Sequence, residues 1–226
     1  MLSKERLRAN LDEVIWNIED ARVSVSEHHI VKLVTVGKYN EVENIESLYH
    51  LGQRAFGENQ VQQLEKRQNI LAELPIEWHF LGNLQKNKIN KLIEVKPSLI
   101  QSLNSIELAL ELNKKLEVKD KRVNCLLQIN SSNNNNQFGV SPEMAQDLYQ
   151  EINERCLNIN LKGVMSIGAN GVDDIEIKDS FETTYKIYES LKKDGAYICS
   201  MGMSGDYKLA IQCGSNLIRV GSALFR

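Results

Sequence analysis

Short apolar runs alternate with longer amphipathic segments along most of the chain. The first run covers residues 31–36, is rich in valine, and precedes Gly37 and Lys38. An apolar residue at nearly every position is typical of a strand that is buried on both faces, as in a parallel sheet. We expect Gly37 to end this strand and Lys38 to lie at its carboxyl end.

Seven further runs have the length and composition of strands, and the segments between them carry apolar residues at helical spacing. The further predicted strands are residues 55–57, 78–81, 99–102, 123–129, 161–167, 197–201 and 217–220. Strands that alternate with helices through short loops form right-handed βαβ units around a parallel sheet. Eight units favour an α/β fold with a closed (β/α)8 TIM-type barrel, and an open doubly wound sheet is the alternative.

The chain length suits one such barrel. A (β/α)8 barrel takes about 250 residues, and this chain has 226. Ser3 can cap an additional helix before the first strand, with Leu7, Leu11 and Val14 on its inner face. We therefore predict a single domain over residues 1–226, with a helical extension at 1–30 and the barrel at 31–226.

Composition narrows the function classes. Hydrophobic residues make up 42% and charged residues 25% of the chain, and the net charge is −3. This balance is ordinary for a soluble globular protein and gives no reason to expect binding to nucleic acid or to an anionic membrane. The amino terminus has no apolar signal region, and no run is long enough to span a membrane. We expect a cytoplasmic protein.

The four cysteines are widely spaced and form no CxxC pair. This pattern favours free thiols packed in the core of a protein from a reducing compartment over disulfides or a zinc site. The four are Cys125, Cys156, Cys199 and Cys213.

Candidate chemistry gathers at the ends of three predicted strands. A lysine such as Lys38 at a barrel mouth can bind a carbonyl ligand through its amine, or it can simply be solvated. Glycines and serines in residues 200–206 and 219–222 follow the seventh and eighth strands, where barrels commonly bind phosphate, although glycines there also serve turns. Arg219 ends a buried strand, so it needs either a ligand acceptor or a structural ion pair. We expect residues 219–222 to end the eighth strand and to run into a short terminal helix.

Other motifs do not carry a function. Lys32 and Tyr39 stand where a Walker A loop needs glycine and serine or threonine, and no GxGxxG follows a strand. His28 and His29 lack further metal-ligand spacing, so we expect them to be exposed. The polar run 131–136 suggests a mobile loop, which could be a lid or a plain surface loop.

Several motifs, in order along the chain, resemble the pyridoxal phosphate homeostasis protein family, the YggS/PROSC type. The resemblance extends from about Val31 to Phe225. Its motifs are VTVGK at 34–38, FGEN at 56–59, WHFLGNLQKNK at 78–88, FG at 138–139, SMGMS at 200–204 and RVGS at 219–222.

The resemblance implies a barrel like the amino-terminal domain of alanine racemase, with pyridoxal 5'-phosphate (PLP) at the carboxyl ends of the strands. Lys38 would hold the cofactor as a Schiff base, and Arg219 would face its pyridine nitrogen. A buried Lys38 beside Arg219 favours the neutral amine that this bond needs. The other residues expected at the cofactor are Asn59, His79, Met165, Ser166, Met203, Ser204, Gly221 and Ser222, with Ser204 and the backbone of Gly221 and Ser222 on the phosphate.

The chain departs from the family pattern in places. Gly37 replaces the usual serine or similar residue, and Asn40 stands where the family has a second lysine. If that lysine assists delivery of the cofactor, the role is in doubt here. Gly168 and Gly205 are further departures, and neither removes a phosphate donor.

The resemblance implies a non-enzymatic protein of intracellular PLP homeostasis. We expect it to be a monomer that sequesters PLP and passes it to PLP-dependent apo-enzymes. A PLP-dependent racemase is the alternative, but it needs a second acid/base group, which a separate domain supplies in racemases and which we do not find before Arg226. A sugar-phosphate enzyme on a generic barrel is a third hypothesis.

Overall fold

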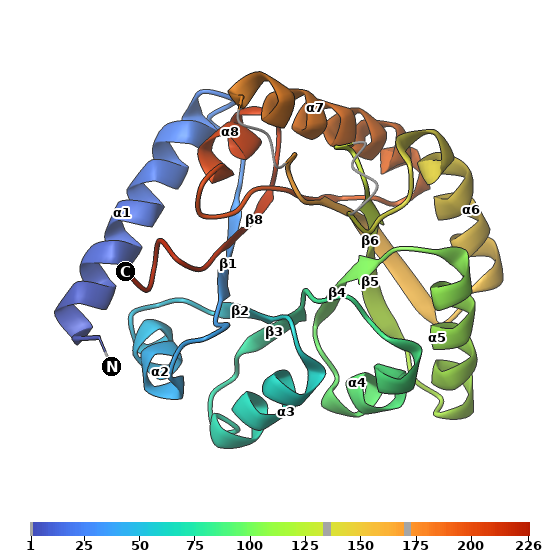
Figure 1. Ribbon diagram of the computed structural model, residues 1–226, viewed down its shortest axis with the longest axis horizontal. Coiled ribbons are helices and arrows are strands. Elements are labelled where there is room, and N and C mark those ends of the chain that lie inside the picture. The colour runs from blue at the N-terminus through green and yellow to red at the C-terminus, as the bar shows by residue number, and fades with distance from the viewer. Residues whose placement is uncertain (1, 133–136, 170–172) are drawn as a thin grey trace.

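The computed structural model describes residues 2–132, 137–169 and 173–226. Eight parallel strands alternate with helices along these residues (Figure 1). The strands are β1 (Lys32–Val36), β2 (Ala55–Glu58), β3 (Glu77–Phe80), β4 (Leu99–Leu103), β5 (Val123–Ile129), β6 (Ile159–Ser166), β7 (Ile198–Ser200) and β8 (Leu217–Val220). The α-helices are α1 (Lys4–Val23), α2 (Val42–His50), α3 (Val61–Ile70), α4 (Ile89–Val95), α5 (Ile106–Val118), α6 (Ala145–Arg155), α7 (Asp174–Leu191) and α8 (Tyr207–Gln212), and short 3-10 helices are η1 (Lys86–Lys88), η2 (Pro142–Met144) and η3 (Lys192–Asp194).

The strands form a closed barrel in sequence order, which confirms the predicted barrel and excludes the open sheet. The seam pairs the first strand with the last in parallel, with Val34 opposite Arg219 and Thr35 opposite Val220. Because all strands run the same way, their carboxyl ends share one mouth of the barrel and their amino ends share the other.

Apolar residues fill two regions. The larger region lies between the barrel and the surrounding helices and includes residues such as Phe56, Leu112 and Phe181. A smaller cluster contains Val34, Ala55, Leu99, Leu126, Met165 and Leu217. These residues come from six strands, as expected for side chains that point into the barrel.

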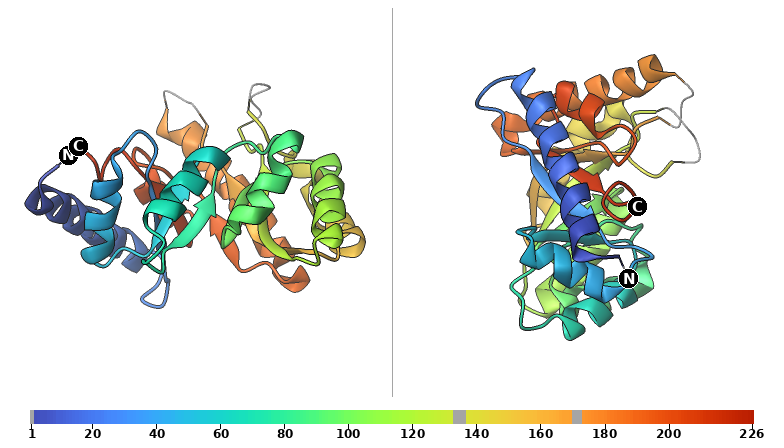
Figure 2. Two further views of the ribbon diagram at one scale, coloured as in Figure 1. Left: turned by 90° about the horizontal axis from the view of Figure 1, so that it is seen from below. Right: turned by 90° about the vertical axis from the view of Figure 1, so that its left-hand side faces the viewer.

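The helix α1 precedes the barrel and packs on its outside against α2 and α8 (Figure 1). Ser3 caps it by accepting a hydrogen bond from the Arg6 amide at 3.2 Å, as predicted. The buried Asn10 amide donates to the carbonyl oxygens of Leu224 and Arg226, each at 2.9 Å. These bonds hold the two ends of the chain together (Figure 2).

Several predicted boundaries were wrong. Residues after β8 form a turn, in which the Leu224 amide donates to the Gly221 carbonyl at 2.9 Å, and not the expected helix. The apolar pattern predicts a helix over residues 181–191, but α7 begins at Asp174, because the Asp173 side chain caps it by accepting a hydrogen bond from the Ile175 amide at 3.0 Å.

The structure bears on the expectations about membrane spans and cysteines. Within residues 2–132, 137–169 and 173–226, no helix is long and apolar enough to cross a membrane. All four cysteines are free, and Cys125, Cys156 and Cys199 are buried, which confirms their prediction as core thiols. Most of the polar run at 131–136 lies outside the described residues.

Candidate functional site

Lys38 lies two residues beyond the end of β1, at the carboxyl mouth of the barrel. The Gly37 amide continues the sheet by donating to the Gly57 carbonyl at 3.1 Å. The Lys38 side chain is exposed, so the prediction that it is buried was wrong. Its Nζ lies 5.9 Å from the Tyr39 ring centroid, and no ion pair joins it to any residue in the described part of the chain. The amine is therefore accessible to a ligand from solvent.

A buried ion pair stands beside this lysine. The side chains of Glu58, at the end of β2, and Arg67, on α3, are each 1% exposed, and Arg67 Nη1 donates to Glu58 Oε1. Arg67 Nη2 also donates to the Asn40 carbonyl. Burial lowers the pKa of Arg67, which is the usual cost of a charge away from water. The pair thus ties the loop that carries Lys38 to the neighbouring strand.

Gly37 lies against this ion pair. A Cβ atom at Gly37 would lie 2.5 Å from Arg67 Nη1 and 2.6 Å from Glu58 Oε1, which is closer than real Cβ contacts. A side chain at this position would therefore force the pair or the backbone to move.

Lys38 also lines a hollow of about 350 Å³ with Asn59. Glu58, Arg67 and the polar side chain of Gln63 contribute to the same wall. The structure thus brings two of the predicted site residues, Lys38 and Asn59, together.

A second group of predicted residues meets where the loops after β7 and β8 come together. Ser204 Oγ accepts hydrogen bonds from the Gly221 amide at 3.1 Å and the Ala223 amide at 3.3 Å. A Cβ at Gly221 would lie 3.1 Å from the Val36 carbonyl oxygen, so this turn lies directly against the strand that leads to Lys38. Both amides are engaged by the hydroxyl oxygen, which leaves the Ser204 hydrogen to be donated to a phosphate.

The Ser222 side chain is exposed on the same turn, and Met203 is 40% exposed on the loop after β7. The Met203 amide donates to Asp206 Oδ1 at 2.6 Å. Burial raises the pKa of that carboxyl group.

Arg219 is buried in the barrel and is held by two oxygens. Its Nη1 donates to Ser200 Oγ at 2.6 Å and its Nη2 donates to the Ser166 carbonyl at 2.8 Å. No carboxylate among the described residues forms an ion pair with it, so the predicted structural ion pair is not found. Burial lowers the pKa of Arg219 to about 10, which leaves the guanidinium charged at neutral pH.

Met165 and Ser166 occupy different environments although they are adjacent. Met165 belongs to the apolar cluster of the barrel interior. The Ser166 hydroxyl instead accepts a hydrogen bond from Thr184 Oγ1 of α7 at 2.9 Å. The Ser166 side chain thus contacts α7, and its backbone carbonyl is the part that contacts Arg219.

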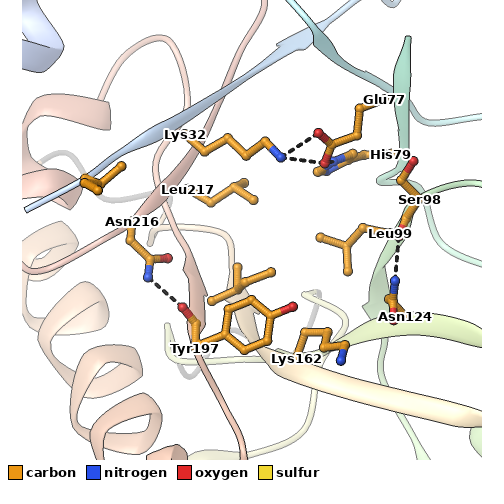
Figure 3. Close-up of a pocket in the computed structure, with 12 residues that line it drawn as sticks. Lys32, Glu77, His79, Ser98, Leu99, Asn124, Lys162, Tyr197, Asn216 and Leu217 are labelled. Carbon is orange, nitrogen blue, oxygen red and sulfur yellow. Dashed lines mark hydrogen bonds and ion pairs between the residues drawn. The ribbon is translucent and has the colours of Figure 1, made fainter. Parts of the chain in front are cut away.

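His79 lies deep in the barrel. Its Nε2 is 2.9 Å from Glu77 Oε1 and its Nδ1 is 2.8 Å from Gln101 Nε2. With Lys32 it lines a pocket of about 390 Å³ at the amino ends of the strands, at the mouth opposite Lys38 (Figure 3). The structure thus groups His79 with Glu77 and Lys32, a set that the sequence did not indicate.

The remaining candidates behave as ordinary polar residues. His28 is exposed, and His29 Nε2 lies 2.9 Å from the Ser215 carbonyl oxygen. The described part of the chain contains no group of three side chains that could hold a metal ion.

Comparison with known proteins gives a family. The model of the alanine racemase amino-terminal domain matches residues 9–226. A pyridoxal phosphate homeostasis protein of Helicobacter pylori is 48% identical over 219 residues, which cover 97% of this chain and 98% of that protein. One of Pasteurella multocida is 36% identical and covers 97% of this chain and 96% of that protein.

Solved structures agree with this assignment. PipY of Synechococcus elongatus, solved with PLP bound, is 30% identical with a TM-score of 0.77, over 92% of this chain and all of that one. The chain belongs to the pyridoxal phosphate homeostasis protein family, which shares the barrel of the alanine racemase amino-terminal domain.

Proposed function

We propose that this protein binds PLP reversibly at the carboxyl mouth of its barrel and thereby controls the free concentration of the cofactor. When bound, PLP supplies an aldehyde that a lysine amine can attack. We assign that amine to Nζ of Lys38. The relatives named as PLP homeostasis proteins and the PipY structure with PLP support the proposal.

The Ser204 hydroxyl, which the Gly221 and Ala223 amides hold in place, is the observation that carries the proposal. The hydrogen of this hydroxyl can be donated to the phosphate, and Ser222 offers a further hydroxyl and amide on the same turn. Gly221 packs against Val36, two residues before Lys38. A ligand with both a phosphate and an aldehyde can therefore use the two groups of residues at once.

A holding function, and not turnover, suits the chemistry of Arg219. Its guanidinium keeps its protons at neutral pH and can only donate hydrogen bonds. An arginine opposite the pyridine nitrogen leaves that nitrogen without a proton, which weakens the ring as an electron sink. We therefore propose that the protein does not catalyse amino-acid racemisation.

Transfer of the cofactor is consistent with the exposure of Lys38. An amine that is open to solvent at a barrel mouth can exchange its ligand without a large movement of the chain. We propose that the protein acts as a monomer in the cytoplasm and passes PLP to apo-enzymes. Free, buried thiols support a reducing compartment.

The test is borohydride reduction of the protein with PLP, followed by peptide mass mapping. We expect the reduced adduct on Lys38 and its loss in Lys38→Ala. Lys86→Ala is the matched control, because Lys86 is an exposed lysine outside the site. An adduct scattered over surface lysines would contradict the proposal.

A second assay separates holding from turnover. Loss of the α-deuteron from several amino acids in the presence of the PLP-loaded protein should stay at the rate of free PLP. Robust exchange that disappears in Lys38→Ala would establish the racemase alternative.

A further inference from the structure

A line of polar side chains crosses the interior of the barrel. Arg219 Nη1 donates to Ser200 Oγ at 2.6 Å, and Ser200 Oγ donates to Gln101 Oε1 at 2.7 Å. Gln101 Nε2 lies 2.8 Å from His79 Nδ1, and His79 Nε2 lies 2.9 Å from Glu77 Oε1. Four strands contribute these five residues, which connect the carboxyl mouth of the barrel to its amino mouth.

The surroundings make this line unusual. The neighbouring interior positions hold apolar side chains such as Leu99, Leu126 and Leu217. Buried polar groups lower stability unless every hydrogen bond is made, so a chain of hydrogen bonds is a costly way to fill a barrel. Gln101 and Ser200 are both fully buried, and the oxygen and the nitrogen of the Gln101 amide each have a partner in the line.

Arg219 determines which atom donates and which accepts in each hydrogen bond of the line. Because a guanidinium can only donate, Ser200 Oγ must accept from Arg219 and gives its own hydrogen to the Gln101 oxygen. The Gln101 amino group then faces His79 Nδ1, which must accept. His79 is therefore neutral and carries its hydrogen on Nε2, from which it donates to Glu77.

Burial favours the same state of the imidazole. It lowers the pKa of His79, and the Glu77 carboxylate only partly offsets this. Hydrogen bonds from His79 and Lys32 lower the pKa of Glu77 to about 2, so the carboxylate stays charged. Further charged or titratable groups face this end from β6 and from the residue before β7, namely Lys162 and Tyr197.

Protonation of His79 would reverse the directions of the hydrogen bonds that Gln101 makes. A hydrogen on Nδ1 would oppose the Gln101 amino group, so the Gln101 amide would have to turn. Its amino group would then face Ser200 Oγ, which already accepts from Arg219. Ser200 Oγ would then accept from both Arg219 and Gln101, and its own hydrogen would lose the Gln101 oxygen as acceptor. The protonation state of His79 therefore changes the hydrogen bonding of the oxygen that holds Arg219.

Solvent reaches the far end of the line. The pocket of about 390 Å³ at the amino mouth exposes Lys32 and Glu77, whose side chains are 47% and 35% exposed (Figure 3). Lys32 Nζ lies 2.6 Å from both oxygens of Glu77. The amino mouth can thus exchange protons without access through the cofactor site.

We propose that Gln101 and Ser200 are positioning residues that couple the Glu77–His79 pair at the amino mouth to Arg219 at the carboxyl mouth. The inference rests on the proposed function, in which Arg219 faces the pyridine nitrogen. Coupling of this kind is reciprocal, so a ligand at Arg219 must also alter His79.

The test is side-chain nitrogen NMR of the histidines in the full chain, with and without PLP. We expect His79 to be neutral with its hydrogen on Nε2, and its signals to shift when PLP attaches, while those of the exposed His50 stay unchanged. Gln101→Leu should abolish the shift although PLP still attaches. Asn124→Ala is the control, since Asn124 lines the same pocket outside the line, and should keep the response.

A second variant gives an effect that a merely structural role would not. In Gln101→Glu a carboxylate faces Nδ1, so the titration midpoint of His79 should rise by about 1–3 pH units. A His79 signal that ignores PLP in the parent protein, or a shift that persists in Gln101→Leu, would overturn the coupling while leaving the proposed function intact. Failure of PLP to attach to Lys38 in the parent protein would instead overturn both.

Discussion

Replacing Gly37 by serine introduces a side chain where a buried ion pair leaves no room. The new Cβ would lie 2.5 Å from Arg67 Nη1 and 2.6 Å from Glu58 Oε1, and 3.0 Å from Ile45 Cδ1. Arg67 also holds the Asn40 carbonyl, so it cannot move without releasing the loop that carries Lys38. The substitution must therefore separate Arg67 from Glu58 or displace the backbone.

The expected cost follows from these two possibilities. Overpacking a well-packed site costs about 1–3 kcal/mol. Breaking a buried ion pair costs about 3–5 kcal/mol, because each charge is left without a partner. We expect Gly37→Ser to lower the free energy of unfolding by about 3 kcal/mol, where the two ranges meet.

The same substitution in a background without the ion pair isolates the cause. In the background Glu58→Gln with Arg67→Met the charges are gone and neither side chain is held by the other, so both can move aside and Gly37→Ser should cost less than about 1.5 kcal/mol. Unfolding in urea, followed by far-ultraviolet circular dichroism, measures each free energy. Gly205→Ser is a control with open space around the new side chain, and should change stability by less than about 0.5 kcal/mol.

An equal cost of Gly37→Ser in both backgrounds would refute the reasoning, because the ion pair would then not be the obstacle. So would a cost below about 1 kcal/mol in the parent protein, since the pair would have relaxed without loss.

Three further predictions concern pH, the phosphate and the thiols. The free energy of unfolding should fall as the pH drops below 6.5, because His79 binds a proton more readily in the unfolded chain than in the folded one. It should fall further between pH 4.5 and 2, where Glu77 becomes protonated in the unfolded chain before it does in the folded one. Urea unfolding at several pH values measures both effects, and His79→Gln should remove the first. Ser204→Ala should weaken binding of PLP about tenfold or more but leave binding of pyridoxal, which has no phosphate, unchanged in a fluorescence titration. Cys213 should react with a thiol reagent before Cys125, because burial raises the pKa of Cys213 only to about 11 and that of Cys125 further, and equal rates would contradict the packing.

The strands could be predicted because each is a short apolar run with its own boundary signals. Residues 123–129 and 217–220 match β5 and β8 to the residue. The turn after β8 could not be distinguished from a helix, because its form depends on hydrogen bonds to Ser204 from the preceding loop. Local pattern does not report such distant partners.

The buried polar side chains were the larger part of the structure that the sequence did not predict. Gln101 lies in an apolar strand, and a period of two does not separate a residue that points into a barrel from one that faces a helix. Arg67 could have been noticed, because it falls on the helix face marked by Val61 and Leu64, and all three side chains are buried. Its partner Glu58 comes from another strand, which no spacing in the sequence indicates.

The seam between β1 and β8 has a consequence for biosynthesis. Lys38 follows the first strand and Gly221 follows the last, and the two loops become neighbours only when these strands pair. A ribosome releases the early strands long before the last one, so the newly made chain presents Lys38, to which we assign PLP attachment, without the residues that we propose for the phosphate. Capture of the cofactor must therefore follow closure of the ring of strands, and PLP present during translation stabilises only the finished molecule.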